Sequence, residues 1–396
     1  MSLRTQTPDE ASRPALFPSE KDRQTLFPVT KAGIFLAHAG VAPLPRVAAE
    51  KVQYEAHRAM TDNQETGETM RELNATRDVA AKLIGAKPSE IALIGPTALG
   101  LNMVAAGLSW APGDEVVYYP GDYPSNVYPW LNLASRGVKT VGLQPETPGA
   151  LTPELVLAAV TPKTKLVALA SCHFLTGYRL DVAVIGTALK ERGVLFCVDG
   201  IQSLGATRLD CRHFDFLAAD SHKWLLGPLG AGILYVKESR FTELRPLLLG
   251  SLNVTSPNFV AQTTIEFPDH ARRYECGAYN ALGIFGMRAS MEMLLALGLD
   301  HIETRLLQLH AHAAGIFREA GFTVLSDRFP EGAKSGIVTI HKPGTDLAPL
   351  MAALQKRRIT ASLRWGLDQQ AYLRFSPHFY NTESELDATV AALQEA

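Results

Sequence analysis

Short apolar runs of strand length alternate with helix-like segments through the first three quarters of this 396-residue sequence. Such runs, bounded by glycine and proline, are typical of buried strands. Strands are predicted at 91–94, 115–119, 140–143, 166–170, 194–198, 214–218 and 232–236, and helices at 71–84, 97–108, 153–160 and 182–192. This alternation predicts an α/β fold in which helices cover a mostly parallel sheet.

The last quarter of the chain has a different pattern. A long apolar helix is predicted at 281–297, and after a further helix a short strand at 336–341 lies beside a helix at 346–356. This pattern favours a second, smaller α+β domain, and the chain is longer than one domain usually is. We predict an N-terminal arm (1–30) that joins the small domain, a large domain (31–285) and a small C-terminal domain (286–396).

Composition excludes several classes of protein. A net charge of −2 favours neither nucleic acid nor a membrane surface as partner. The apolar run 91–110 contains Gly95 and Pro96, which predict a strand and a buried helix in place of a membrane span. The four cysteines are widely spaced, which argues against a zinc or disulfide scaffold and favours a cytoplasmic location. His310 and His312 fall on different sides of a helix, so no metal site is predicted.

An acid and a lysine carry the clearest chemical signal. Asp199 follows the apolar run 194–198, at the carboxyl end of a predicted buried strand, where α/β sheets bind ligands. Lys223 lies between two predicted strands, away from any exposed helix face. A lysine that forms a Schiff base with pyridoxal phosphate needs an acid at the pyridine nitrogen, because the protonated ring is the electron sink. Alone, Asp199 could cap a turn and Lys223 could be a surface residue; together they predict a pyridoxal phosphate site.

Other segments offer groups for the cofactor and its substrate. Thr97 stands where a strand ends and a helix begins, so we predict that it caps a helix whose N-terminus binds phosphate, unless the cap is an ordinary one. Tyr123 is either a stacking partner for the pyridine ring or a packed loop residue. Gln202 is a polar site residue or a plain helix start. Arg374 either grips an α-carboxylate or forms a surface ion pair.

Four segments together resemble a known family. They read Tyr-Pro-Ser-Asn-Val-Tyr-Pro-Trp (123–130), Val-Asp-Gly-Ile-Gln (198–202), Ala-Asp-Ser-His-Lys-Trp-Leu-Leu-Gly-Pro (219–228) and Arg-Phe-Ser-Pro-His-Phe-Tyr-Asn-Thr (374–382). In this order they resemble the class V aminotransferases, a family of pyridoxal phosphate enzymes that includes cysteine desulfurases, selenocysteine lyases and isopenicillin N epimerases. The resemblance extends from about residue 35 to residue 383.

The resemblance implies the aspartate aminotransferase fold, which is fold type I of the pyridoxal phosphate enzymes, and a homodimer with the active site at its boundary. It implies that Lys223 forms the Schiff base and that Asp199 pairs with the pyridinium. It also implies that Gln202 binds the phenolic oxygen and that Tyr123 stacks on the ring. Arg374 is implied to bind the substrate carboxylate, and the segment 273–280 to reach the partner's phosphate.

The phosphate end of the site departs from the family pattern. The resemblance places Thr97, Ala98, Asp220 and His222 around the cofactor phosphate, with Thr97 and His222 in contact with it. Ala98, like Ala278, stands where many relatives have a threonine hydroxyl, and Asp220 brings a negative charge near the expected phosphate position. The set of groups that completes the phosphate cup therefore stays open.

A second departure concerns the reaction. Cysteine desulfurases carry a nucleophilic cysteine shortly before the carboxylate-binding arginine, but the segment 359–373 is short and contains none. We expect an enzyme that acts on a small amino acid through an external aldimine and a Cα carbanion. Transamination ranks first, and a C–S or C–Se β-lyase or an epimerase is the alternative. A non-catalytic binding protein of the same fold is the second alternative.

The substrate pocket is the least defined part of the predicted site. Its candidate lining residues are His38, His173, Phe174 and Trp365, each of which has ordinary packing as its alternative.

Overall fold

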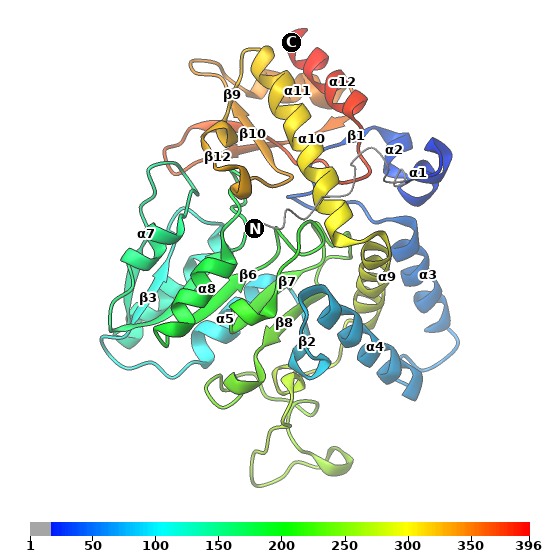
Figure 1. Ribbon diagram of the computed structural model, residues 1–396. Helices are drawn as coiled ribbons and strands as arrows, with labels where there is room; N and C mark the ends of the chain where they lie inside the picture. Colours follow the sequence, from blue (N-terminus) through cyan, green and yellow to red (C-terminus); the bar gives the residue numbers. More distant parts are fainter. Residues whose placement is uncertain (1–16) are drawn as a thin grey trace, which may run out of the picture.

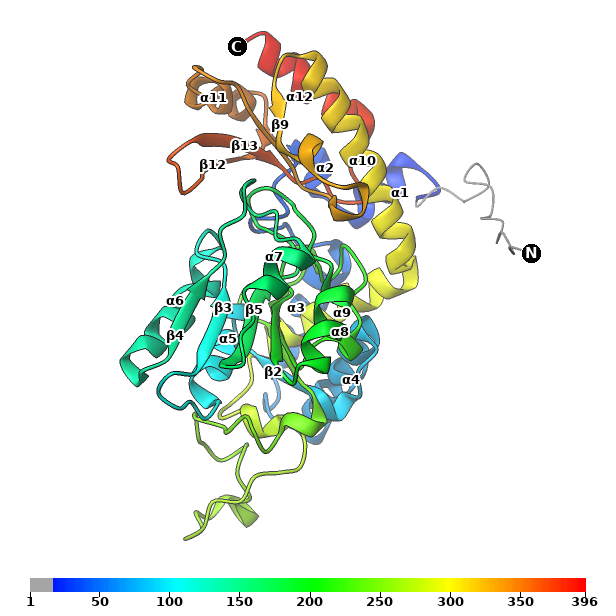
Figure 2. The ribbon, with the colours of Figure 1, turned by 60° about the vertical axis from the view of Figure 1, so that its left-hand side comes forward.

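The computed structural model describes residues 17–396, so part of the predicted arm, residues 1–16, lies outside the described residues. A large sheet with its helices forms one half of the molecule, and a smaller sheet with its own helices lies beside it (Figures 1 and 2). This α/β architecture with a smaller α+β part confirms the predicted fold class.

The large sheet has seven strands in the order β2-β8-β7-β6-β5-β3-β4. Strand β8 is antiparallel to both neighbours, and all other pairs are parallel. The strands are β2 (Ile91–Ile94), β3 (Glu115–Tyr118), β4 (Lys139–Gly142), β5 (Thr164–Ala170), β6 (Leu195–Asp199), β7 (Phe216–Asp220) and β8 (Gly232–Val236). All seven predicted strands are present, but β7 begins and ends two residues later than predicted, so that Asp220 closes it.

Each strand alternates its side chains between two cores, one on each face of the sheet. In β6, Phe196 and Val198 pack into one core, and Leu195 and Cys197 into the other. Because successive side chains of a strand point to opposite faces, the Asp199 side chain lies on the same face of the sheet as Leu195 and Cys197. Helix α5 covers this side, so the strand aims the Asp199 carboxylate toward the start of α5.

The predicted helices around the large sheet are present, with some ends shifted. The helices there are α3 (Arg46–Arg58), α4 (Gly67–Ile84), α5 (Thr97–Gly107), α6 (Tyr128–Leu131), α7 (Pro153–Ala158), α8 (Val182–Glu191) and α9 (Ala281–Leu297), of which α3 and α6 were not predicted. Helices α3 and α4 pack against α9. Gly85 ends α4 in the left-handed conformation that glycine adopts readily.

The smaller sheet is antiparallel, with the order β12-β13-β10-β9, and β1 and β11 form a separate short parallel pair that packs into the same core. The strands are β1 (Ile34–Phe35), β9 (Thr323–Val324), β10 (Val338–His341), β11 (Ile359–Thr360), β12 (Ser362–Trp365) and β13 (Ala371–Phe375); the helices are α10 (Leu299–Glu319), α11 (Ala348–Lys356) and α12 (Glu383–Gln394). Phe317, Leu373 and Phe375 lie in the core between them.

Helices α9 and α10 connect the two halves. Leu294 of α9 and Leu306 of α10 pack into a core of the large sheet, whereas Leu309 packs into the core of the smaller one. The predicted boundary between residues 285 and 286 stays a prediction. Within residues 17–396 no single helix is long and apolar enough to cross a membrane, and α9 and α10 reach that length only as a pair bent by 82°.

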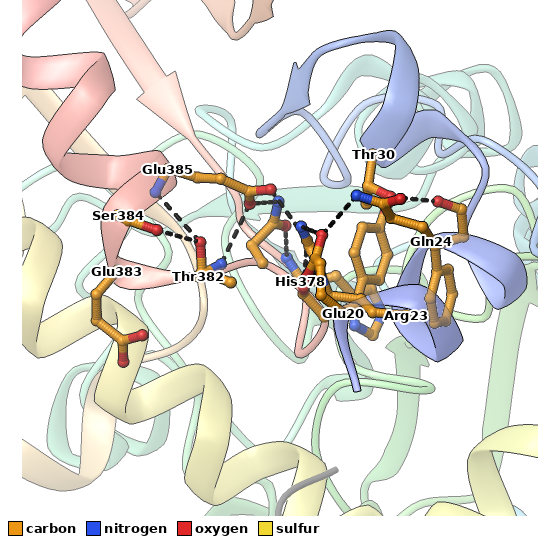
Figure 3. A network of polar contacts seen from close by, with 12 residues as sticks. Glu20, Arg23, Gln24, Thr30, His378, Thr382, Glu383, Ser384 and Glu385 are labelled. Carbon is orange, nitrogen blue, oxygen red and sulfur yellow. Dashed lines mark hydrogen bonds and ion pairs between the residues drawn. The ribbon is translucent and has the colours of Figure 1, made fainter. Parts of the chain in front are cut away.

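The described part of the N-terminal arm contacts the smaller half (Figure 3). It contains α1 (Glu20–Leu26) and α2 (Val29–Ala32). The Arg23 guanidinium donates to the Tyr380 carbonyl and to Glu385 Oε1, both at 2.9 Å. Glu385 also belongs to the capping box that begins α12 at Thr382. These contacts join α1 to the start of α12, and the assignment of residues 1–30 as one arm stays a prediction.

At Gly186, helix α8 packs directly against the backbone of His213. A Cβ at this position would lie 1.8 Å from the His213 carbonyl oxygen, so the helix would have to shift. We expect Gly186→Ala to destabilise the protein by about 1–3 kcal/mol. The matched control is Gly315→Ala in α10, where a Cβ would meet nothing within 4 Å and where we expect a gain of about 0.5–1 kcal/mol. Urea unfolding measures both, and equal effects would contradict the packing argument.

Candidate active site

A cavity of about 280 Å³ lies where the carboxyl end of β6, the start of α5 and the β12–β13 hairpin meet. It is at the lower end of the range for small-molecule sites. Seven residues predicted from the sequence line it: Thr97, Ala98, Tyr123, Asp199, His222, Lys223 and Arg374. Phe174, a predicted pocket residue, lines it as well. Segments far apart in the sequence thus converge on one small space.

Asp199 is held at the end of β6 with one oxygen available. Its Oδ1 accepts a hydrogen bond from the Ile201 N–H at 3.0 Å, and within residues 17–396 no donor is bonded to Oδ2. Burial, and then the negative charge of Asp122, raises the pKa of Asp199 to about 7. A positively charged ring N–H in the cavity would favour the ionised carboxylate and donate to its free oxygen.

Lys223 lies in the turn that follows β7. Its Nζ is 5.3 Å from the centroid of the Tyr123 ring, and only 8% of the residue is exposed. Burial lowers the pKa of Lys223, Asp199 opposes this effect, and Arg374 and Arg364 add to it, so that the pKa is about 8. A substantial fraction of the amine is therefore neutral near physiological pH, as a nucleophile or a general base requires.

The start of α5 differs from the prediction for Thr97. Pro96, in an extended conformation, occupies the cap position, and Thr97 is the first helical residue. The Thr97 hydroxyl accepts a hydrogen bond from the Asp220 N–H at 2.8 Å, so it joins α5 to the end of β7 and does not cap the helix. The prediction of a Thr97 cap was wrong. The Leu99 N–H donates to the Pro96 carbonyl at 2.8 Å, whereas the Thr97 and Ala98 N–H groups have no acceptor within the helix and are available to an anion.

Asp220 lies behind this end of the cavity and does not line it. Its Oδ1 accepts from the Ser221 N–H at 2.7 Å and its Oδ2 from the Gly230 N–H at 3.3 Å. His222 does line the cavity, with Nδ1 3.1 Å from Asp220 Oδ2 but without an aligned hydrogen-bond partner. The Asp220 carboxylate therefore binds backbone N–H groups and lies beside His222, and it is not part of the cavity wall.

Two histidines predicted to contact substrate are not on the cavity wall. His38 is fully buried, with Nδ1 2.8 Å from the Ser376 carbonyl and Nε2 2.7 Å from the Tyr380 hydroxyl. His173 contacts the Thr176 hydroxyl at 2.9 Å through Nδ1 and a backbone carbonyl at 3.1 Å through Nε2. Burial keeps the pKa of His38 well below its usual value and lowers the pKa of His173 to about 4. Packing and hydrogen bonds hold both rings off the cavity wall, and their contact with substrate stays a prediction.

Gln202 and Trp365 also lie off the cavity wall. The Gln202 side chain donates to the Ala39 carbonyl at 3.1 Å and accepts from the Trp224 indole N–H at 2.8 Å. Its second amide hydrogen has no partner among the described residues, so its role toward the cofactor's phenolic oxygen stays a prediction. Trp365 is 56% exposed and does not line the cavity.

Two functional candidates were missed at the sequence level. Arg364 lines the cavity from β12, and its placement depends on how the β12–β13 hairpin pairs. Asp122 follows the strand β3 and lies buried behind Tyr123, where its carboxylate accepts from the Tyr123 N–H and from Asn126. Burial raises the pKa of Asp122 to about 6. A polar residue soon after a predicted parallel strand was the signal that could have identified Asp122.

The residues around the cavity fit pyridoxal phosphate. Lys223 supplies a partly neutral amine, Asp199 a carboxylate oxygen without a partner, and Tyr123 an aromatic face. The start of α5 supplies backbone N–H groups for a phosphate. Arg374 adds a buried guanidinium whose Nε has no hydrogen-bond partner within residues 17–396, as expected of a group that binds an anionic ligand.

The lowered pKa of Lys223 leads to a prediction for the apoprotein. Only the neutral amine reacts with the cofactor aldehyde, so the rate of cofactor capture should rise with pH and level off above about 8. Stopped-flow absorbance at pH values from about 6 to about 10, on either side of this pKa, measures the rate. A rate that continues to rise tenfold per pH unit to the top of this range would contradict the environment described for Lys223.

Comparison with known proteins agrees with this geometry. The family model described as aminotransferase class-V matches residues 34–389. A probable cysteine desulfurase of Methanothermobacter thermautotrophicus is 30% identical over 76% of this chain and 77% of its own. The isopenicillin N epimerase of Streptomyces clavuligerus is 30% identical over 89% of this chain and 92% of its own.

Among solved structures, the apo cysteine desulfurase of Thermococcus onnurineus superposes with a TM-score of 0.87 at 25% identity, over 96% of this chain and 98% of its own. The family match covers most of the chain, and the fold and the cavity agree with it. The protein is therefore an enzyme of the class V aminotransferase family, and its cofactor is pyridoxal 5′-phosphate.

Proposed function

We propose that this enzyme removes the α-proton of a small amino acid, most simply for transamination. The observation that carries the proposal is that Lys223, Asp199 and Arg374 line one small cavity. An amine that moves protons, an acid for the pyridine nitrogen and a cation for the α-carboxylate are what this chemistry needs from the protein.

Each of the three side chains has a distinct task. Arg374 binds the α-carboxylate; burial and the neighbouring Arg364 lower the pKa of Arg374 to about 9, so the guanidinium stays charged at neutral pH. Lys223 Nζ accepts the α-proton and returns it. The bound cofactor supplies an electron sink for the pair of electrons left at Cα. Asp199 keeps the ring nitrogen protonated by placing a negative charge beside it.

The cysteines do not support desulfuration through a protein persulfide. No cysteine of the described chain lines the cavity, and none lies in the β12–β13 hairpin. Cys172 is 1% exposed, and burial raises its pKa to about 11, which disfavours the reactive thiolate. Transamination needs no thiol and is therefore the first candidate.

β-Elimination from a cysteine-like amino acid is the second candidate. The relatives named as probable cysteine desulfurases favour a reaction at a C–S bond. Elimination begins with the same α-proton transfer by Lys223 and releases the sulfur group without a protein nucleophile. Removal of a β-substituent then gives an unsaturated amino acid, which hydrolyses to a keto acid and ammonia.

Product analysis separates these reactions. The holoenzyme is incubated with single amino acids in deuterated water, and keto acid, pyridoxamine phosphate, ammonia and released sulfide or thiol are measured. Transamination gives pyridoxamine phosphate and keto acid without ammonia, whereas elimination gives pyruvate, ammonia and a sulfur product. Exchange of the α-proton together with formation of the opposite enantiomer, and without either product, indicates epimerisation. Absence of exchange with every amino acid would overturn the proposed function.

We also propose that the enzyme is a homodimer. We expect it to be located in the cytoplasm. The segment 247–265 extends away from the large sheet in both views (Figures 1 and 2). It exposes apolar side chains, at Leu247, Leu248, Leu249, Phe259, Val260 and Ile265. Exposed apolar groups gathered in one segment mark interaction surfaces. Sedimentation equilibrium should give twice the 43.0 kDa of the chain, and a monomer at micromolar concentration would contradict this proposal.

A further inference from the structure

Arg364 and Arg374 approach each other across the β12–β13 hairpin. Ser362 lies opposite Arg374, and Arg364 follows Ser362 by two residues on the same strand. Residues two apart on a strand share a face, so the hairpin presents both arginines on the side that faces the cavity. Both line that cavity.

The two guanidinium groups converge beside Gly40. The position that a Cβ at Gly40 would occupy is 3.8 Å from one terminal nitrogen of Arg374 and 3.9 Å from one of Arg364. The absence of a side chain at Gly40 leaves this point open to the cavity, which Gly40 also lines. Two cations thus face one small space from the same hairpin.

Neither guanidinium is neutralised by the protein. Within residues 17–396 no carboxylate forms an ion pair with Arg364 or Arg374. Arg374 is 1% exposed and donates to the Phe174 carbonyl and, at 3.5 Å, to the Ser362 hydroxyl, while its Nε has no partner. Like charges at this separation repel, and bound anions would offset that repulsion.

One α-carboxylate does not use both arginines. A carboxylate bound side-on to Arg374 accepts hydrogen bonds from its Nε and one terminal nitrogen, and this bidentate pair occupies both carboxylate oxygens. Arg364 then retains its own donors on the cavity wall beside Arg374. Because Arg364 is exposed, water hydrates its charge when the substrate side chain is neutral, and an anionic side chain would replace that water with an ion pair.

We propose that Arg364 binds a second anionic group on the substrate, so that the preferred substrate is a short dianionic amino acid, an aminodicarboxylate or its sulfinate analogue. This inference rests on the proposed function, in which Arg374 takes the α-carboxylate. The small cavity limits the side chain to a few atoms between Cα and the second anion.

Matched acid and amide substrates test this specificity. L-Aspartate is compared with L-asparagine and L-glutamate with L-glutamine, with α-proton exchange as the readout common to all candidate reactions. For the preferred pair, we expect kcat/KM to be about 10- to 100-fold higher for the acid than for the amide, the usual contribution of a charge-assisted hydrogen bond. In Arg364→Gln this preference should fall to near unity, mainly through the acid, and Arg364→Lys should restore part of it.

The control variant is Arg357→Gln, which removes an exposed arginine that pairs with Glu395; it should keep the preference of the wild type. If Arg364→Gln lowers kcat/KM for acid and amide by the same factor, Arg364 serves the α-carboxylate and the inference is wrong. Equal rates for acid and amide in the wild type would overturn it as well.

A binding measurement separates failure of this inference from failure of the proposed function. Glutarate and succinate carry two carboxylates but no amino group, and their binding to the holoenzyme can be followed by quenching of cofactor fluorescence. We expect tighter binding than for butyrate, with the difference lost in Arg364→Gln. If no amino acid exchanges its α-proton but the dicarboxylates still bind more tightly than butyrate, the proposed function fails and the anion site stands. If the wild type binds the dicarboxylates no more tightly than butyrate, the inference is wrong.

Discussion

Replacing Lys223 with alanine is expected to abolish measurable turnover. The variant loses the amine that transfers the α-proton, an effect of about 10²–10⁴-fold on its own, and also loses covalent attachment of the cofactor. Steady-state rates with the best amino acid found by product analysis measure the change. Because Lys223 packs in a preformed turn after β7, we expect the variant to fold and still to bind the cofactor weakly through the start of α5 and His222.

The matched control for Lys223 is Lys82→Ala, at an exposed position near the end of α4. This variant should retain the wild-type rate and the visible absorbance of the holoenzyme. External methylamine supplies a further check, because a small amine entering the cavity can replace a missing base. If Lys223→Ala keeps more than a tenth of the wild-type rate, another group transfers the proton and the assignment of Lys223 is wrong.

Asp199→Asn is expected to have the second largest effect. The substitution keeps the shape of the side chain but removes the negative charge that stabilises a protonated ring nitrogen. Loss of one partner of a buried ion pair costs about 3–5 kcal/mol, which corresponds to roughly 10²- to 10⁴-fold in kcat. Activity assays with saturated cofactor measure this loss, and the absorption spectrum reports the protonation state of the ring.

Apoprotein stability distinguishes a chemical role of Asp199 from a structural one. Because the pKa of Asp199 is raised on folding to about 7, its ionisation costs stability as pH rises from the unfolded value toward 7, and that cost persists above pH 7. The neutral amide of the Asp199→Asn variant carries no such cost. The apo variant should therefore melt at the same or a higher temperature than the wild type at a pH of about 8, where the wild-type carboxyl is mostly ionised. A lower melting temperature together with lost activity would indicate a structural role.

Asp122→Asn is the matched control for that experiment. Asp122 is also a buried carboxylate, but it lies behind Tyr123 and does not line the cavity. We expect a smaller loss of activity than for Asp199→Asn. Equal losses would show that the pair acts as one unit.

The strands of the large sheet could be predicted because each is a short, buried apolar run. The chemistry of Asp199 and Lys223 followed from their positions after such strands. The sequence could not show that β7 continues to Asp220, since its last two residues join the sheet through their pairing with Ile233 and Gly232 of β8. It also could not show that the Thr97 hydroxyl would bond to the Asp220 N–H, which depends on how α5 meets the sheet.

Side-chain direction in loops was the part of the site beyond prediction. His173 and Phe174 are adjacent, yet only Phe174 lines the cavity, because hydrogen bonds turn the His173 ring toward Thr176. Arg364 was missed for a related reason. Its place beside Arg374 depends on the register of the β12–β13 hairpin, which pairs residues across a turn that carries no strong sequence signal.

Mapping the lysine that carries the cofactor tests the central claim most directly. The holoenzyme is treated with borohydride, which fixes the cofactor to its lysine, and is then digested and sequenced by mass spectrometry. The account predicts a single labelled peptide with the modification on Lys223, and no label in Lys223→Ala. Label on any other lysine, or a holoenzyme that borohydride leaves unlabelled, would contradict it.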